Sequence, residues 1–154
     1  MPNRIGPSGL DAELRLAVYR RIAESGAAPS PVELARWFDI APMEAEDSLR
    51  RLAETEGALV LLPGSAYVWM AEPFSAVRTS FAVESGSQRW WGNCIWDALA
   101  VLALLDRDGT VSTSCPDCAD PLRVSVEGGA LTNDDAVAHF AVPARDWWRD
   151  IGFT

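Results

Sequence analysis

The chain has 154 residues, enough for one or two small domains, and 49% of them are hydrophobic, which is ordinary for a globular protein. Its formal net charge is −9 and all 13 basic residues are arginine, so a partner held through nucleic-acid phosphates is not expected. No apolar run approaches the roughly 18 residues of a membrane-spanning helix, and the N-terminus lacks a secretory signal, so we expect a cytoplasmic protein without a membrane partner.

Two helices are predicted at the start of the chain. Apolar residues recur at helical spacing over residues 10–24, and Gly26 follows them as a stop signal. Ser30 and Glu33 have the spacing of a capping box, with a proline directly after the serine. This pattern predicts a second helix that reaches Phe38, and a turn then leads to a third.

The third helix is expected over residues 43–54, before a β-hairpin with strands at residues 59–62 and 66–70. This order of elements predicts a winged-helix-like three-helix domain with a β-hairpin at residues 1–72. The third helix carries four acidic residues against two arginines, which is a poor composition for reading the major groove of DNA. We therefore do not expect this domain to read DNA, and a winged-helix transcriptional regulator is an alternative.

The second region, residues 73–154, is predicted to contain one apolar helix and several short strands. Asn93 is the expected N-cap of a helix that runs from Cys94 to about Leu105. The expected strands span residues 79–83, 110–114, 122–127 and 137–142, and a short final helix spans residues 145–150. The chain is therefore predicted to be an α+β protein whose second region combines a helix with a small mixed or antiparallel sheet.

Cys94 and Asp97 are the leading candidates for chemistry. Side chains three residues apart on a helix share one face, so the thiol and the carboxyl are expected to point the same way. In the first helical turn the dipole favours the thiolate, the form that binds soft metals, and the carboxyl could deliver a proton. Together they are the minimum for protonolysis of a metal–carbon bond. The alternative is a buried core cysteine beside an aspartate that only interacts with the helix dipole.

Cys115 and Cys118 form a CPDC loop between two predicted strands, which resembles half of a zinc knuckle. A structural zinc site needs four ligands, and the spacing does not require a Cys3His site completed by Cys94 and His139. An odd number of cysteines in a cytosolic protein favours free thiols or a bound metal over disulfides. A tight turn with two free thiols is therefore the favoured interpretation, and His139 is expected to be a packed residue in an apolar strand.

Three segments carry a resemblance to a known family. Residues 91–99, WGNCIWDAL, the strand TVSTSC at residues 110–115 and the next strand at residues 122–126 together resemble the alkylmercury (organomercurial) lyase family. That family has an aromatic residue just before a Cys-x-x-Asp helix, then a strand ending in Ser-x-Cys, then a second strand. The order of the two domains also matches, so the resemblance covers most of the chain.

The resemblance implies cleavage of a carbon–mercury bond, in which thiolates hold the soft Hg(II) and an aspartate supports proton delivery to the departing carbon. It places the first catalytic cysteine at Cys94 and the aspartate at Asp97, and it makes Cys115 structural. The family's second catalytic cysteine would follow Thr154. We therefore expect a truncated chain or a divergent member without lyase activity, unless the CPDC loop folds over Cys94 so that Cys118 substitutes.

The pocket at this site is expected to be walled by Trp91 and Trp96. Its ligand would be a small organometallic compound or a soft metal ion, with small thiols as co-reactants. Mercury would be substrate and product, and no cofactor is required. The competing hypothesis from another class is a non-catalytic metal- or thiol-binding module that uses Cys94, Cys115 and Cys118.

Overall fold

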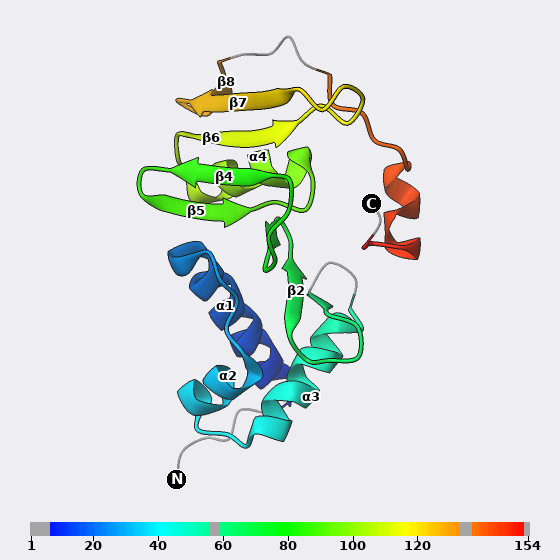
Figure 1. The fold of residues 1–154 in the computed structure, drawn as a ribbon. Coiled ribbons are helices and arrows are strands. Elements are labelled where there is room, and N and C mark those ends of the chain that lie inside the picture. The colour runs from blue at the N-terminus through cyan, green and yellow to red at the C-terminus, as the bar shows by residue number, and fades with distance from the viewer. Residues whose placement is uncertain (1–6, 56–58, 133–136, 153–154) are drawn as a thin grey trace.

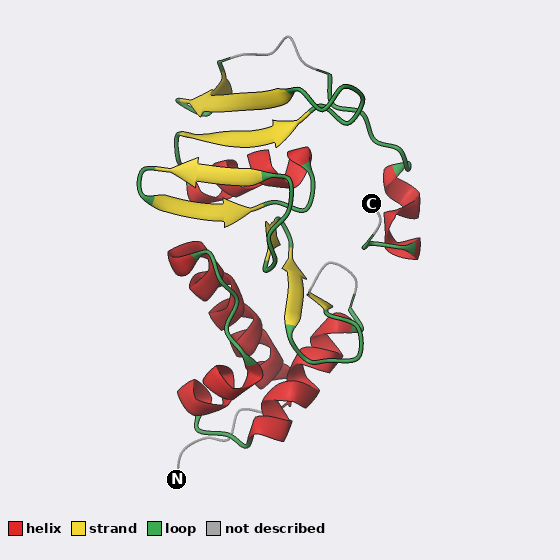
Figure 2. Ribbon diagram, in the orientation of Figure 1, coloured by secondary structure: helices red, strands yellow, loops and turns green. Residues whose placement is uncertain are grey.

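A computed structural model describes residues 7–55, 59–132 and 137–152. Three helices gather in one half, and a five-stranded sheet with a further helix against it forms the other (Figure 1, Figure 2). The α+β class predicted from the sequence is confirmed. No helix within the described ranges is long and apolar enough to cross a bilayer.

Three helices form the N-terminal half: α1 (Pro7–Ser25), α2 (Pro31–Phe38) and α3 (Pro42–Ala53). The predicted capping box is present at the start of α2. The Glu33 backbone N–H donates to Ser30 Oγ at 3.2 Å, and the Ser30 backbone N–H donates to Glu33 Oε2 at 2.8 Å. Two of the amide groups that a helix start leaves unpaired are thereby satisfied, which explains why α2 begins where the sequence predicts.

The predicted hairpin is present as β1 (Val60–Leu61) and β2 (Val68–Ala71), which pair antiparallel. A short strand that the sequence does not predict, β3 (Phe74–Ser75), pairs with the other edge of β2. Phe74 also forms a bridge with Gly92, so this small sheet adjoins the second half of the chain. The order of elements is the predicted one, while the winged-helix assignment and a domain boundary after residue 72 stay predictions.

The second sheet is antiparallel throughout, with the strand order β5-β4-β6-β7-β8. Its strands are β4 (Ala82–Ser85), β5 (Gln88–Trp91), β6 (Gly109–Ser114), β7 (Pro121–Glu127) and β8 (Ala130–Leu131). The helix α4 (Ile95–Leu105) follows β5 and packs on β4 and β6. The short strands β5 and β8 were not predicted, because each is only a hairpin arm without the alternation that marks a longer strand.

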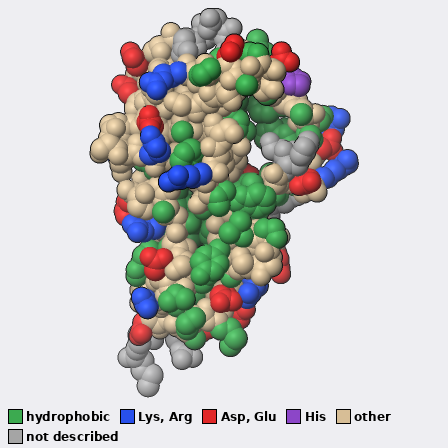
Figure 3. All heavy atoms as spheres, viewed as in Figure 1, with side chains coloured by type: hydrophobic (Ala, Val, Ile, Leu, Met, Phe, Trp, Pro, Cys, Tyr) green, Lys and Arg blue, Asp and Glu red, His purple; other side chains and the backbone are tan. Residues whose placement is uncertain are grey.

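One hydrophobic core connects the two halves. Trp90 is 1% exposed, and its indole N–H donates to the carbonyl oxygens of Ile22 at 3.1 Å and Ala23 at 3.0 Å, near the end of α1. A buried tryptophan satisfies its single donor in this way while it fills the space between helix and sheet. Hydrophobic side chains also reach the surface across the middle and lower parts of the face in Figure 3.

The strand predicted at residues 137–142 is wrong. These residues have no strand pairing among the described parts of the chain; Val137 is 92% exposed and His139 is exposed as well. Local preference for an extended chain is therefore not enough, because a strand needs a neighbour to pair with its backbone. The next element, η1 (Ala144–Arg149), is a 3-10 helix at the position of the predicted short helix.

Candidate active site

The start of α4 is fixed by a close approach between backbone segments. Gly92 follows β5, and a Cβ at this position would lie 2.5 Å from the backbone nitrogen of Ala98. Only glycine allows the chain to pass this close to the helix. Cys94 then has extended backbone, with φ −142° and ψ −177°, and its carbonyl accepts the first helical hydrogen bond from Ala98 at 3.0 Å. Cys94 is therefore the N-cap residue, and the prediction that Asn93 caps the helix is wrong by one position.

Cys94 and Asp97 lie in one small cavity of about 40 Å³. That volume exceeds the roughly 10–15 Å³ that an enclosed water molecule needs, so the cavity can admit a small ligand. The structure thus brings the two candidate side chains together, with Cys94 as the extended N-cap residue and Asp97 as the third residue of the helix. The residues that line the cavity are Met70, Glu72, Asn93, Cys94, Asp97, Trp147 and Ile151.

Asp97 is held by Asn93, whose side-chain Nδ2 donates to Asp97 Oδ2 at 2.9 Å. Asn93 therefore turns its amide toward the carboxyl three residues into the helix, which is why it does not act as the cap. Burial raises the pKa of Asp97, and the hydrogen bonds from the Asn93 side chain and backbone oppose the increase without cancelling it. A carboxyl whose pKa is raised in this way keeps its proton to higher pH and can donate it.

Glu72 places a second carboxyl in the cavity. It follows β2, and the Tyr19 hydroxyl donates to its backbone carbonyl at 3.0 Å, which connects this position to α1. Burial raises the pKa of Glu72, and the negative charge of Asp97 raises it further. No local pattern singles out Glu72, because it is 25 positions before Asp97 and belongs to no motif.

Burial also raises the pKa of the Cys94 thiol. The backbone amides of Asp97 and Trp96 face the sulfur and lower the pKa, although neither completes a capping hydrogen bond. The charges of Asp97 and Glu72 act the other way. The expectation that the start of the helix favours the thiolate of Cys94 is therefore wrong for the net effect. Desolvation and two neighbouring carboxyls outweigh the dipole, so the resting form at neutral pH is the thiol.

The predicted tryptophan wall is also wrong. Trp96 is 62% exposed, since it lies two residues after Cys94 and points to another side of the helix. Trp91 follows the buried Trp90 on β5, so its ring lies on the opposite face of the strand, where Arg78 stacks over it at 6.0 Å. The tryptophan that lines the cavity is Trp147 of η1, whose Nε1 donates to the Val142 carbonyl at 2.8 Å.

The other candidate ligands lie elsewhere. Cys115 and Cys118 are in the loop between β6 and β7 and do not line the Cys94 cavity. The described residues contain no group of three histidine, cysteine or acidic side chains arranged to hold a metal ion. A joint site of the three thiols, a Cys3His site with His139, and a replacement role for Cys118 beside Cys94 therefore have no support in the structure.

The CPDC loop has its own electrostatics. The backbone amides of Cys118 and Asp117, followed by the Cys118 side chain, lower the pKa of Cys115. For Cys118 the largest single influence is the amide of Asp120, which lowers the pKa. The Asp120 carboxyl and the Cys115 sulfur outweigh it, so the net shift is upward. Each of the two thiols therefore influences the pKa of the other, and no residue of α4 contributes to either shift.

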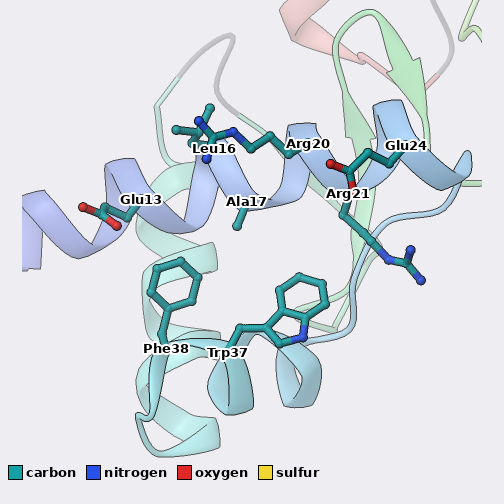
Figure 4. Close-up of a pocket in the computed structure, with 8 residues that line it drawn as sticks. All are labelled: Glu13, Leu16, Ala17, Arg20, Arg21, Glu24, Trp37 and Phe38. Atoms are coloured by element: carbon teal, nitrogen blue, oxygen red, sulfur yellow. The ribbon is translucent and has the colours of Figure 1, made fainter.

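A larger hollow of about 380 Å³ lies between α1 and α2, with apolar walls and charged residues at its rim (Figure 4). It contains no thiol and does not adjoin Cys94. The residues around it are Glu13, Leu16, Ala17, Arg20, Arg21, Glu24, Trp37 and Phe38. It offers a surface for packing and lies apart from the cysteines of the chain.

Residues 74–154, more than half of the chain, match the family described as MerB, alkylmercury lyase. The chain belongs to the alkylmercury lyase family. This match begins at β3 and includes the whole of α4 with Cys94 and Asp97. No protein with a curated description matches the chain significantly.

The fold agrees with the family. A crystal structure described as the mercury-bound form of MerB2 superimposes with a TM-score of 0.59 and 17% sequence identity, over 80% of this chain. This chain spans 64% of the length of that one. The likeness to that structure thus extends over more of the chain than the family match and includes part of the N-terminal half, although an identity this low shows the fold alone.

Proposed function

We propose that this chain is a lyase that cleaves carbon–mercury bonds by protonolysis, with Cys94 as the mercury ligand and Asp97 as the proton donor. The observation that carries the proposal is the cavity in which a thiol and a carboxyl of raised pKa lie together at the start of α4. Membership of the alkylmercury lyase family supports the substrate class.

The chemistry follows from the protonation states. The Cys94 sulfur binds the mercury of an R–Hg–X compound and displaces the anion X⁻, which takes up the thiol proton and leaves as HX. Mercury is soft, so the sulfur–mercury bond offsets the cost of deprotonating a buried thiol. The Asp97 carboxylic acid then transfers its proton to the carbon. The electron pair of the carbon–mercury bond becomes the new C–H bond, R–H leaves, and Hg(II) remains on sulfur.

Release of Hg(II) requires a further thiol. A small thiol from solution can provide the second sulfur ligand and carry the ion away, since the described residues place no second cysteine in the cavity. Glu72 adds a second carboxyl close to Asp97 and can return a proton to it between turnovers. We therefore expect turnover to depend on the concentration of added thiol.

The two alternatives receive less support. In α3, Arg50 pairs with Glu46 at 2.9 Å and Arg51 pairs with Asp11 at 2.7 Å, so both arginines of the presumed recognition helix already have acidic partners. A module in which all three thiols bind one metal ion requires them to be close together, and Cys94 is apart from the other two. We therefore favour the lyase over a DNA-binding regulator and a three-thiol module.

The test is release of benzene from a phenylmercury salt in excess small thiol, measured by gas chromatography for wild type, Cys94→Ser and Cys118→Ser. We expect wild type and Cys118→Ser to release benzene at similar rates, while Cys94→Ser falls to the rate without protein. Equal release by wild type and Cys94→Ser would show that this cavity does not carry the reaction.

A further inference from the structure

The loop between β6 and β7 holds two thiols that the proposed lyase chemistry does not use. Cys115 ends the ladder of β6; its N–H donates to the Asp120 carbonyl at 2.8 Å, and its own carbonyl accepts from the Ala119 N–H at 2.9 Å. Ala119 has φ +61°, a left-handed conformation that is uncommon for alanine and closes the turn. These contacts fix the backbone on both sides of the Cys-Pro-Asp-Cys sequence.

Backbone amides face the sulfur atoms inside this turn. The N–H groups of Asp117 and Cys118 are directed at the Cys115 sulfur, and the N–H of Asp120 is directed at the Cys118 sulfur. Successive amides in a turn that includes a left-handed residue form a concave site for negative charge, an arrangement that occurs at iron–sulfur centres. The turn therefore directs backbone N–H groups toward both sulfur atoms, where they can support the negative charge of metal-bound sulfur.

The two thiols are also accessible and close to each other. Cys118 is exposed, Cys115 is half-buried, and both are free cysteines whose side chains hydrogen-bond to one another. The Cys118 thiol also lies 3.3 Å from Asp120 Oδ2, which can accept its proton. A cation from solution can thus reach both sulfurs without disturbing the hydrophobic core.

We propose that Cys115 and Cys118 form a second site, separate from the Cys94 cavity, that binds a soft cation satisfied by two sulfur ligands, of the class of Hg(II) or Cu(I). As two sulfur–metal bonds form, the two thiols release two protons. The number of ligands selects this class, because the described residues offer no third histidine, cysteine or acidic group in the arrangement of a metal site. Zinc in a structural site takes four protein ligands and is therefore not the expected occupant.

The test uses the full chain with Cys94→Ser, so that the first cavity cannot contribute and lyase activity is not needed as a readout. One equivalent of Hg(II), Cu(I) or Zn(II) is added alone, glutathione is titrated in as a competitor, and protein-bound metal is measured after gel filtration. We expect about one Hg(II) or Cu(I) per chain to be retained and Zn(II) to be lost. When Cys115→Ser or Cys118→Ser is added to this background, the glutathione concentration that removes half of the bound metal should fall by about 100-fold. A single thiol loses the advantage of two linked ligands.

Asp117→Asn in the same Cys94→Ser background is the matched control, since it alters the loop between the thiols and keeps both sulfurs. It should retain metal as its parent does, and circular dichroism should show that all variants are folded. Equal retention by the parent and by either loop-cysteine variant would overturn the two-thiol site. Tight retention of Zn(II) would overturn the assignment to a two-coordinate soft cation.

Discussion

The Asn93 side-chain nitrogen lies 2.9 Å from Oδ2 of Asp97, and this hydrogen bond spans the boundary between the loop and the first turn of α4. The other end of the same amide, Oδ1 of Asn93, is buried without a hydrogen-bond partner among the described residues. An asparagine amide has both donors and an acceptor, so it can partner a carboxyl in either protonation state. Asn93 can therefore hold Asp97 in place in both protonation states that the proposed proton transfer requires.

The first prediction concerns the proton donor. Asp97→Asn keeps the shape of the side chain and removes its acidic proton, so benzene release from a phenylmercury salt should fall by about 100-fold to 10,000-fold. Binding of the organomercurial to Cys94 should persist, as seen by mass spectrometry of the intact adduct. Asp106→Asn is the matched control, since Asp106 lies at the far end of α4 with φ +50°, a conformation that asparagine tolerates. A variant at position 97 with the wild-type rate would assign the proton to another group.

The second prediction concerns the titration of Cys94. Its pKa is raised first by burial, and the charges of Asp97 and, to a smaller extent, Glu72 add to that effect. Removing either charge should therefore lower the pKa, with Asp97→Asn having the larger effect and Glu72→Gln the smaller. The pH profile of Cys94 alkylation by iodoacetamide, measured by mass spectrometry of the peptide that contains Cys94, should shift to lower pH in both variants. An unchanged profile would mean that the carboxyls do not act on this sulfur.

The third prediction concerns stability in the helical half. Asp11 accepts from Ser48 Oγ at 2.5 Å and from Arg51 Nη2 at 2.7 Å, which joins α1 to α3. Asp11→Asn should lower the free energy of unfolding at pH 7 by about 1 kcal/mol, a modest value because Arg51 is 42% exposed. Asp47→Asn is the control. Both side chains of the Asp47–Arg50 ion pair are exposed, so this pair should contribute almost nothing to the free energy of unfolding.

The same pair predicts a pH dependence. The hydrogen bond from Arg51 lowers the pKa of Asp11 in the folded chain below its ordinary value of 3.8. The stabilisation is therefore fully present above that ordinary value and is lost as pH falls through the lower, folded-state pKa. Urea unfolding at several pH values should show the difference between wild type and Asp11→Asn shrinking at the acid end. A difference that stays constant down to the lowest pH would contradict the ion pair.

The fourth prediction concerns the placement of α4. Gly92→Ala puts a methyl group 2.5 Å from the Ala98 nitrogen, so the helix start must move. We expect a loss of about 1–3 kcal/mol in stability together with a clear loss of lyase rate, because Cys94 and Asp97 move with the helix. Gly86→Ala is the comparison: it meets open space at φ +58°, so it should lose about 1 kcal/mol and keep the rate. Full activity in Gly92→Ala would show that this contact does not set the geometry of the cavity.

Local patterns in the sequence determined the elements that have their own signals. The capping box of Ser30 and Glu33 starts α2, and the apolar run after Cys94 forms α4, because both depend on contacts within a few residues. The spacing of Cys94 and Asp97 likewise placed both side chains in one cavity, since the side chain of an N-cap residue lies close to the third residue of its helix. The resemblance to alkylmercury lyases came from the same segment and agrees with the family match.

Only the tertiary structure decided what surrounds those two side chains. Glu72 reaches the cavity from the position after β2 and Trp147 from η1, and no local pattern relates positions so far apart in the chain. The ionisation of Cys94 was mispredicted because a helix dipole can be inferred from sequence, whereas burial beside two carboxyls cannot. The strand prediction at residues 137–142 was wrong for the same reason, because a strand needs a pairing partner that distant parts of the chain must provide. Periodicity specifies which way a side chain points, while its solvent exposure and its partners depend on segments brought together by folding.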